Sequence, residues 1–192
     1  MTILILASSS PYRRELLERL GIDFEVVSPA VDESLRAEET PAAATLRLAR
    51  AKAQAVAARR PEALILASDQ LASLDGEALG KPHDAETARR WLAQMSGRTV
   101  TYHTAVALLA PGESEAATHL DQSHAVLRRF DAGEIARYLE QTQPLDCAGA
   151  LRLEGLGAAL CERIETADPT ALIGLPLIAT ARLLRDQGYT LP

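Results

Sequence analysis

The segment LASSSPYRRELLERLG, residues 6–21, shows how this chain begins to fold, because it changes from apolar to polar and then to amphipathic. The aliphatic run at residues 2–7 predicts a short buried strand, and the serines after it predict a polar loop. Leucines recur at helical spacing over residues 16–20, and Gly21 suits the turn that often ends a helix. A strand, a loop and a helix in this order indicate an α/β fold.

The rest of the sequence alternates strands and helices and adds antiparallel pairs. Thr40 followed by proline predicts a helix start, and Asp75-Gly76 between apolar runs predicts a hairpin. Further strands are expected at residues 23–28, 63–68, 99–109 and 118–130. Further helices are expected at residues 41–60, 83–96, 131–141 and 173–187. No repeat or linker divides the chain, so we expect one domain, residues 1–192, built on a mixed β-sheet with flanking helices.

Composition narrows the class of protein. The 192 residues are 47% hydrophobic and 24% charged, which suits one packed core and argues against disorder. The formal net charge of -6 argues against a nucleic-acid partner, which would require a basic surface. Cys147 and Cys161 form no CxxC pair, and the scattered histidines provide no zinc-ligand spacing. With no signal peptide and no run of ~20 apolar residues, we expect a cytoplasmic protein without a membrane partner.

The serine loop has the features of an anion site. Ser8, Ser9 and Ser10 place hydroxyls and backbone N–H groups at a helix N-terminus, whose partial positive charge attracts anions. Arg13 and Arg14 lie in the first turn, where cations oppose the helix dipole, and a bound phosphate would remove that conflict. The alternative is a serine N-cap followed by solvated arginines. The spacing alone does not separate these two interpretations.

Two acidic motifs follow predicted strands. Asp32-Glu33 comes after the second strand, and Asp69 comes directly after the aliphatic third strand. The carboxyl ends of strands are where sheet proteins often place reactive groups. Carboxylates from two such ends can share a divalent cation, which prefers hard oxygen ligands. The alternative for each acid is an ordinary turn residue.

Two lysines are candidate phosphate ligands. Gly80-Lys81-Pro82 follows Gly76, but the glycine spacing is one residue short of a P-loop, and proline replaces the magnesium-binding Ser or Thr. We therefore reject a P-loop but keep Lys81 as a phosphate ligand held near the sheet by the hairpin. Lys52 stands alone in an alanine-rich helix, where it is either an exposed residue or a cation directed at a site.

Together these segments resemble the Maf family of nucleotide pyrophosphatases over nearly the whole chain. The opening LASSSPYRRELLERLG is similar to that family's signature loop and helix. The blocks that follow in the family's order and approximate spacing are VDES, LARAKA, ASDQ, LGKP, MSGRTVTYHTAVAL, PLDCAGALRLEG and GLPLIA. The resemblance implies an elongated α/β fold related to the inosine-triphosphate pyrophosphatases, with a cleft between two lobes and usually a homodimer.

The resemblance also implies a set of site residues. Asp69 matches the family's proposed general base. The residues that match its phosphate- and metal-handling positions are Ser8, Arg13, Glu33, Lys52 and Lys81. We expect Mg²⁺ or Mn²⁺, bound by Glu33 and possibly Asp69, to bridge phosphate oxygens while the cations stabilise the leaving pyrophosphate. Water attack within the triphosphate follows, and whether Asp69 acts as base, metal ligand or both is left open.

Three features of the sequence are similar to the branch of the family that hydrolyses 7-methyl-GTP. Gln70 stands where members acting on dTTP and UTP typically have threonine, and Glu154 stands where those members have glutamine. The CAG motif at residues 147–149 completes the pattern. Tyr12 departs from it, because that branch often has tryptophan there, and a tyrosine makes base stacking weaker.

The chemistry of these side chains agrees with a guanine base. A guanine edge offers two adjacent N–H donors that the Glu154 carboxylate can accept together, whereas a pyrimidine lacks that pair. N7-methylation makes the base cationic, which favours an acidic partner and the face of Tyr12. The alternatives are a pyrophosphatase for dTTP, UTP or modified pyrimidine nucleotides, and a nucleotide-binding regulator of septum formation, a process with which Maf proteins are associated.

Overall fold

A single mixed sheet of seven strands forms the framework in the computed structural model, which describes residues 2–192. The strands are β1 (Leu4–Ala7), β2 (Glu25–Val27), β3 (Leu64–Leu74), β4 (Glu77–Leu79), β5 (Thr99–Leu109), β6 (Ala117–Leu127) and β7 (Cys161–Glu165). Their order is β2-β1-β3-β5-β6-β7, with β4 paired to β3. β1 runs parallel to β2 and β3, and the remaining pairs are antiparallel. The predicted mixed sheet is confirmed.

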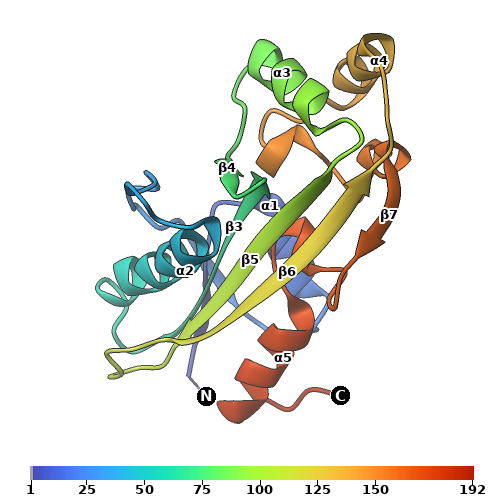
Figure 1. Ribbon diagram of the computed structural model, residues 1–192. Coiled ribbons are helices and arrows are strands. Elements are labelled where there is room, and N and C mark those ends of the chain that lie inside the picture. The colour runs from blue at the N-terminus through green and yellow to red at the C-terminus, as the bar shows by residue number, and fades with distance from the viewer. Residues whose placement is uncertain (1) are drawn as a thin grey trace.

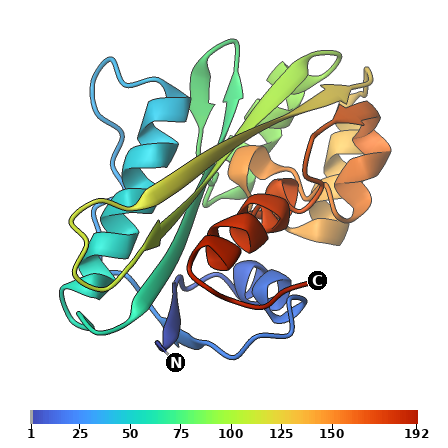
Figure 2. The ribbon, with the colours of Figure 1, turned by 90° about the horizontal axis from the view of Figure 1, so that it is seen from below.

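Helices cover the sheet in two groups, which gives an elongated molecule with two lobes (Figures 1 and 2). The α-helices are α1 (Pro11–Glu18), α2 (Pro41–Ala57), α3 (Ala85–Met95), α4 (Ala132–Thr142) and α5 (Leu177–Asp186). Three short 3₁₀ helices are η1 (Ala148–Ala150), η2 (Leu156–Leu160) and η3 (Ala171–Ile173). α2 packs on one face of the sheet and α1 and α5 on the other. α3 and α4 form a separate core at the far end of the long strands.

Local capping explains where the helices begin. Thr40 and Asp84 each accept a backbone N–H from the first turn of the helix they precede, α2 and α3 respectively. Asp131 and Glu134 form a reciprocal capping box at the start of α4. These polar side chains satisfy donors that a helix N-terminus leaves unpaired, so the predicted starts near these residues are confirmed.

β3 is longer than predicted and changes the position of Asp69. The strand continues through residues 68–74, so Asp69 lies in its middle and not directly after its end. Along one edge, β3 pairs with β1 as far as Ala67 and with β4 from Ala72 onward. Within the described residues that edge is therefore open over residues 68–71, while the other edge pairs continuously with β5. Asp69 lies on this open stretch.

Two further predictions are corrected at the C-terminal end. The last helix begins at Leu177 and not at Ile173, because Gly174 has a left-handed φ of 126° and Pro176 has no N–H to donate. Strand β7 was not predicted, since its residues are mostly exposed and lack an apolar alternation. Across residues 2–192, no helix combines the length and apolar character needed to span a bilayer.

Candidate active site

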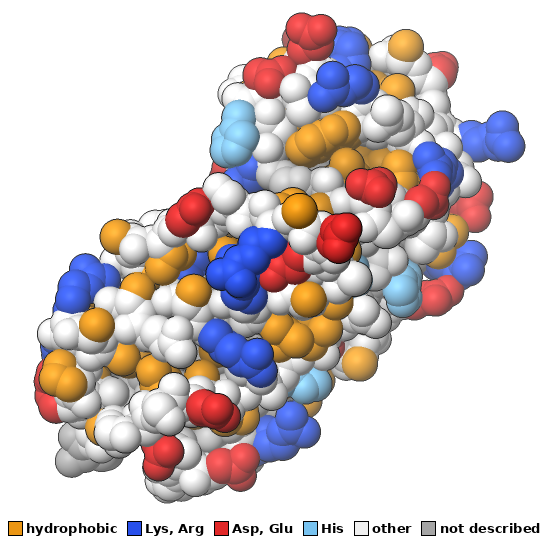
Figure 3. All heavy atoms as spheres, turned by 60° about the vertical axis from the view of Figure 1, so that its left-hand side comes forward, with side chains coloured by type: hydrophobic (Ala, Val, Ile, Leu, Met, Phe, Trp, Pro, Cys, Tyr) orange, Lys and Arg blue, Asp and Glu red, His pale blue; other side chains and the backbone are white. Residues whose placement is uncertain are grey.

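A cavity of about 600 Å³ opens at the uncovered stretch of β3, between the two lobes. Figure 3 shows basic and acidic side chains gathered together at the waist of the elongated molecule. The predicted site residues that line the cavity are Ser8, Tyr12, Arg13, Glu33, Lys52, Asp69, Gln70, Lys81 and Glu154. The fold therefore brings all nine of them to one cleft, which confirms the predicted cleft between lobes.

The serine loop supports the cleft largely through its own hydrogen bonds. Ser8 is buried, and its Oγ accepts the backbone N–H of Ser10 at 3.1 Å. Ser10, in turn, is the N-cap of α1 and accepts the N–H of Arg13 at 3.5 Å. The expected serine cap is thus present, but Ser10 provides it. Ser8 still lines the cavity, where its hydroxyl hydrogen remains available to an anion.

The two arginines of α1 have different roles. Arg13 points toward the cavity, and its Nε donates to the carbonyl oxygen of Gly174 at 2.9 Å. That bond leaves the two terminal NH₂ groups of the guanidinium for a ligand. Burial lowers the pKa of Arg13, although the nearby charges of Asp69 and Glu33 oppose the shift. Arg14 pairs instead with Glu18 at 2.9 Å on the exposed side of the helix. The alternative of a solvated arginine therefore applies to Arg14 but not to Arg13.

Lys52 joins the two carboxylates of the site. Its Nζ lies 2.6 Å from Asp69 Oδ1 and 2.8 Å from Glu33 Oε1, although these residues come from three separate segments. Lys52 is only 4% exposed, so it is not a solvated residue of α2. A buried ammonium requires such partners, because an unpaired charge would be strongly destabilised there.

Asp69 and Glu33 share this lysine, but their pKa values shift in opposite directions. Burial raises the pKa of Asp69, and the opposing charges of Lys52 and Arg13 do not fully compensate. Glu33 is much more exposed, so burial raises its pKa less, and the hydrogen bond and charge of Lys52 bring that pKa below its usual value. Asp69 Oδ2 is buried and finds no hydrogen-bond donor among residues 2–192. This oxygen is therefore the atom of the carboxylate that lacks a protein partner and that a bound ligand, proton or cation would satisfy.

The residues present fit the hard-oxygen chemistry of a divalent cation. Among the described residues there is no cluster of three or more His, Cys, Asp and Glu side chains that could hold a metal alone. Asp69 Oδ2 and the accessible Glu33 carboxylate do provide two oxygen donors beside a cavity. Mg²⁺ commonly takes one or two carboxylates and completes its coordination with water and substrate phosphates. The donor set is thus suited to a metal that arrives with a polyphosphate.

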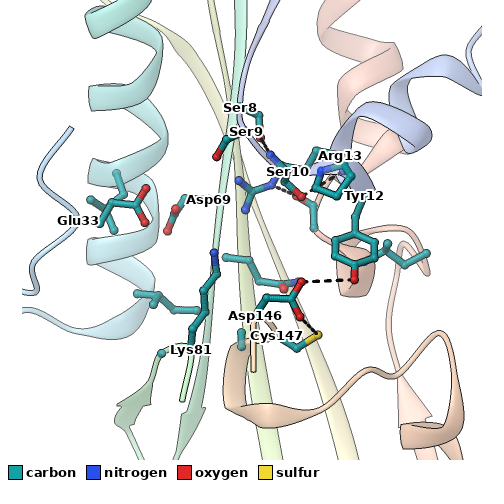
Figure 4. A pocket seen from close by; sticks show the side chains of 18 of the residues that line it. Ser8, Ser9, Ser10, Tyr12, Arg13, Glu33, Asp69, Lys81, Asp146 and Cys147 are labelled. Atoms are coloured by element: carbon teal, nitrogen blue, oxygen red, sulfur yellow. Dashed lines mark hydrogen bonds between the residues drawn. The ribbon is translucent and has the colours of Figure 1, made fainter. Parts of the chain in front are cut away.

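Lys81 lies on the other side of the cavity from the serine loop. It follows β4, and Figure 4 shows its side chain extending toward Asp69, with the Glu33 and Asp69 carboxylates facing each other nearby. The carbonyl of Gly80 accepts the N–H of Gly149 at 2.9 Å, so this segment is attached to the 146–154 segment. The hairpin places Lys81 at the cleft, as predicted.

The opposite end of the cleft carries Tyr12 and two residues that sequence reasoning missed. The Tyr12 hydroxyl lies 3.5 Å from Asp146 Oδ2, a long contact that Figure 4 also shows. Arg152 lies over the Tyr12 ring, 5.6 Å from its centroid, and its Nη2 is 3.3 Å from Asp146 Oδ1. Glu154 is exposed at the edge of the cavity. No local pattern marked Asp146 and Arg152, because their relation to Tyr12 exists only in the folded chain.

Cys147 is not suited to act as a nucleophile. It lines the cavity beside Asp146, but burial raises the pKa of its thiol to about 11. The thiolate is the reactive form of cysteine, and little of it exists near neutral pH at such a pKa. The raised pKa therefore argues against covalent catalysis through this residue at neutral pH.

An open strand edge with a buried carboxylate, three basic side chains and an aromatic ring defines an α/β protein whose cleft is chemically suited to a phosphorylated ligand. The family described as Maf-like protein matches residues 3–187, and the chain belongs to this Maf family. The chain is 53% identical over 192 residues to the 7-methyl-GTP pyrophosphatase of Xanthomonas axonopodis pv. citri, with 100% of both chains covered.

Further similarities extend across nearly the full length. The 7-methyl-GTP pyrophosphatase of Cupriavidus metallidurans is 52% identical over 186 residues, which cover 97% of this chain and 94% of that protein. Among solved structures, a nucleoside-triphosphatase / dITP/XTP pyrophosphatase from Mycobacterium abscessus aligns with 97% of this chain and 96% of its own. The TM-score of that alignment is 0.49 and the sequence identity is 17%.

Proposed function

We propose that this chain is a nucleoside triphosphate pyrophosphatase that hydrolyses 7-methyl-GTP to 7-methyl-GMP and pyrophosphate. The observation that carries the proposal is the buried Oδ2 of Asp69, which has no hydrogen-bond partner among residues 2–192 and belongs to a side chain lining the same cavity as Arg13, Lys52 and Lys81. Such an oxygen can accept a proton from water, and the cations can offset the charge of a triphosphate. Full-length relatives at 50–53% identity that carry this enzyme name support the choice of substrate.

In the proposed reaction a water oxygen attacks the α-phosphorus and the bond between the α-phosphorus and the bridging oxygen breaks. Asp69 Oδ2 takes the proton from the water, and pyrophosphate leaves with the electron pair of the broken bond. Lys52 holds the other oxygen of Asp69 and so orients the carboxylate. The two terminal NH₂ groups of the Arg13 guanidinium and the Lys81 ammonium stabilise the charge on the pyrophosphate.

The base end of the cleft supports guanine recognition. Tyr12, Gln70 and Glu154 line the same cavity as Asp69. The exposed carboxylate of Glu154 can accept two adjacent N–H donors, and the Tyr12 ring offers a face to a cationic base. A pyrimidine base would leave the carboxylate with fewer partners and would lack the cationic charge.

We also propose Mg²⁺ or Mn²⁺ as cofactor, held by Glu33 and Asp69, and a homodimer that acts in the cytoplasm. The metal would supply charge that polarises phosphate oxygens and lowers the pKa of water. Excess chelator should abolish activity and added Mg²⁺ or Mn²⁺ should restore it. Full activity in chelator would refute the metal and, with it, Glu33 as a ligand.

Light scattering during gel filtration tests the proposed homodimer. A molecular mass equal to that of one chain would contradict it.

A pyrophosphate-release assay over a panel of nucleotides tests the substrate. We expect kcat/KM to be highest for 7-methyl-GTP, lower for GTP, and lowest for UTP and dTTP. Release of orthophosphate in place of pyrophosphate would contradict the reaction. Preference for UTP or dTTP would contradict the substrate but leave the pyrophosphatase activity intact.

A further inference from the structure

The side-chain amide of Gln70 has one defined orientation. Its Nε2 lies 3.0 Å from Thr104 Oγ1, 2.8 Å from the carbonyl oxygen of Ala171 and 3.1 Å from that of Leu172. Carbonyl oxygens only accept hydrogen bonds, so the NH₂ group must be the half of the amide that faces them. Gln70 Oε1 accepts no hydrogen bond within the described residues. Since Gln70 lines the cavity, this oxygen is the polar atom that it offers to a ligand.

Thr104 completes this arrangement from the neighbouring strand. It is paired directly with Gln70 in the register of β3 and β5, and it is only 1% exposed. Its hydroxyl donates to the carbonyl of Ala171 at 2.9 Å, which leaves its lone pairs to accept from Gln70. The bonds therefore run in one direction, from Gln70 to Thr104 to Ala171. If the amide turned over, Oε1 would face the two backbone carbonyls, which only accept, and Thr104 could donate to it only by giving up its bond to Ala171.

The carbonyls that hold Gln70 belong to a segment that is itself fixed. Asp168 is buried, and its Oδ1 accepts from the N–H and the hydroxyl of Thr170 at 2.9 and 2.5 Å. Its Oδ2 accepts the N–H of Ile178 at 2.8 Å, which anchors the segment to α5. The carbonyl of Gly174, in the same segment, accepts from Arg13. The orientation of the amide thus depends on a rigid backbone and not on the ligand.

We propose that Thr104 is a positioning residue that, together with the carbonyls of Ala171 and Leu172, holds Gln70 as a hydrogen-bond acceptor and thereby contributes to the choice of base. The inference rests on the proposed function, because it concerns the same cavity. A glutamine free to turn over could offer NH₂ to the carbonyl oxygens of a pyrimidine as readily as Oε1 to a donor. A fixed Oε1 accepts hydrogen bonds from the N–H groups of a guanine edge but cannot donate one to the carbonyl oxygens of a pyrimidine. Thr104 lies outside the cavity lining and acts only through Gln70.

The test compares Thr104→Val, which removes the hydroxyl at similar volume, with Thr104→Ser, which keeps it. For Thr104→Val we expect the ratio of kcat/KM for 7-methyl-GTP to that for UTP to fall about three- to tenfold, the value of one neutral hydrogen bond. The change should appear mainly in KM, with kcat for 7-methyl-GTP within about twofold of wild type. Thr104→Ser should keep the wild-type ratio.

A structural role alone would lower the melting temperature and reduce activity on both nucleotides equally, and that result would overturn the inference. An unchanged ratio in a folded Thr104→Val variant would overturn it as well. If the valine variant does not fold, Thr104→Ala serves in its place, since it removes the hydroxyl without crowding. A cycle with Gln70→Met adds an independent test: once Gln70 is replaced, the Thr104 substitution should no longer change the ratio. Absence of 7-methyl-GTP cleavage by the wild type would instead contradict the proposed function itself.

Discussion

At one end of the cleft Lys52 and Asp69 are buried and lie 2.6 Å apart, whereas at the other end Tyr12 and Asp146 lie 3.5 Å apart and Asp146 is exposed. The difference follows from solvation. Buried charges are tolerated only in short, complementary contacts, while exposed groups can remain loosely paired because water solvates them. The phosphate end is therefore organised before any ligand binds. The base end combines half-buried Tyr12 and Gln70 with Asp146 and Glu154, which are exposed and lie outside the regular elements, where specificity can vary without disturbing the reactive groups.

The largest effect is expected at the buried end. Asp69→Asn removes the proton acceptor but keeps the size of the side chain. We expect turnover of 7-methyl-GTP to fall by roughly 10²–10⁴-fold, the usual contribution of a positioned base, while nucleotide binding persists. Steady-state kinetics and calorimetric titration with the nucleotide measure the two quantities. A folded variant with a near wild-type rate would show that Asp69 is not the base.

An intermediate effect is expected at Glu154, whose exposed carboxylate is proposed to bind the base. Glu154→Gln replaces a carboxylate with an amide that cannot accept from two donors at once. We expect kcat/KM for 7-methyl-GTP to fall roughly 10- to 100-fold, while activity on UTP changes much less. If the ranking of the nucleotides is unchanged in this variant, Glu154 is an ordinary exposed turn residue.

The smallest effect is expected at the long contact of Tyr12. Tyr12→Phe removes only the hydroxyl whose contact with Asp146 is long and exposed, so we expect less than about a threefold change in KM. Tyr12→Leu removes the ring as well, and KM for 7-methyl-GTP should rise by about 3- to 30-fold, the range of a cation–π contact. Equal KM values for both variants and the wild type would exclude stacking on this residue.

Sequence-based inference located the site but not its internal contacts. The resemblance to the Maf family identified nine residues that the fold places around one cavity. Lys52 was predicted as a phosphate ligand, and its pairing with two carboxylates was not foreseen. Asp69 was expected directly after its strand but lies within it, because an aliphatic run does not reveal that pairing with β5 extends the strand through polar residues.

Signals that act over a few residues were sufficient for the helix starts and the hairpin. Thr40, Asp84 and Asp131 cap the helices that follow them, because a side chain can satisfy the backbone donors two or three positions ahead. The Asp75-Gly76 turn joins β3 to β4 in the same way, through backbone preferences of its own two residues. Local sequence is therefore enough to predict these features.

The pairing and orientation of the reactive groups depend instead on contacts between distant segments of the folded chain. Lys52 meets Asp69 across 17 positions, and Gln70 meets the carbonyl of Ala171 across 101. Such contacts depend on which strand edge is left open and on where a distant segment packs, neither of which a local pattern encodes. The physical reason is burial: once these polar groups leave water, each must take whatever partner the fold places within hydrogen-bond distance.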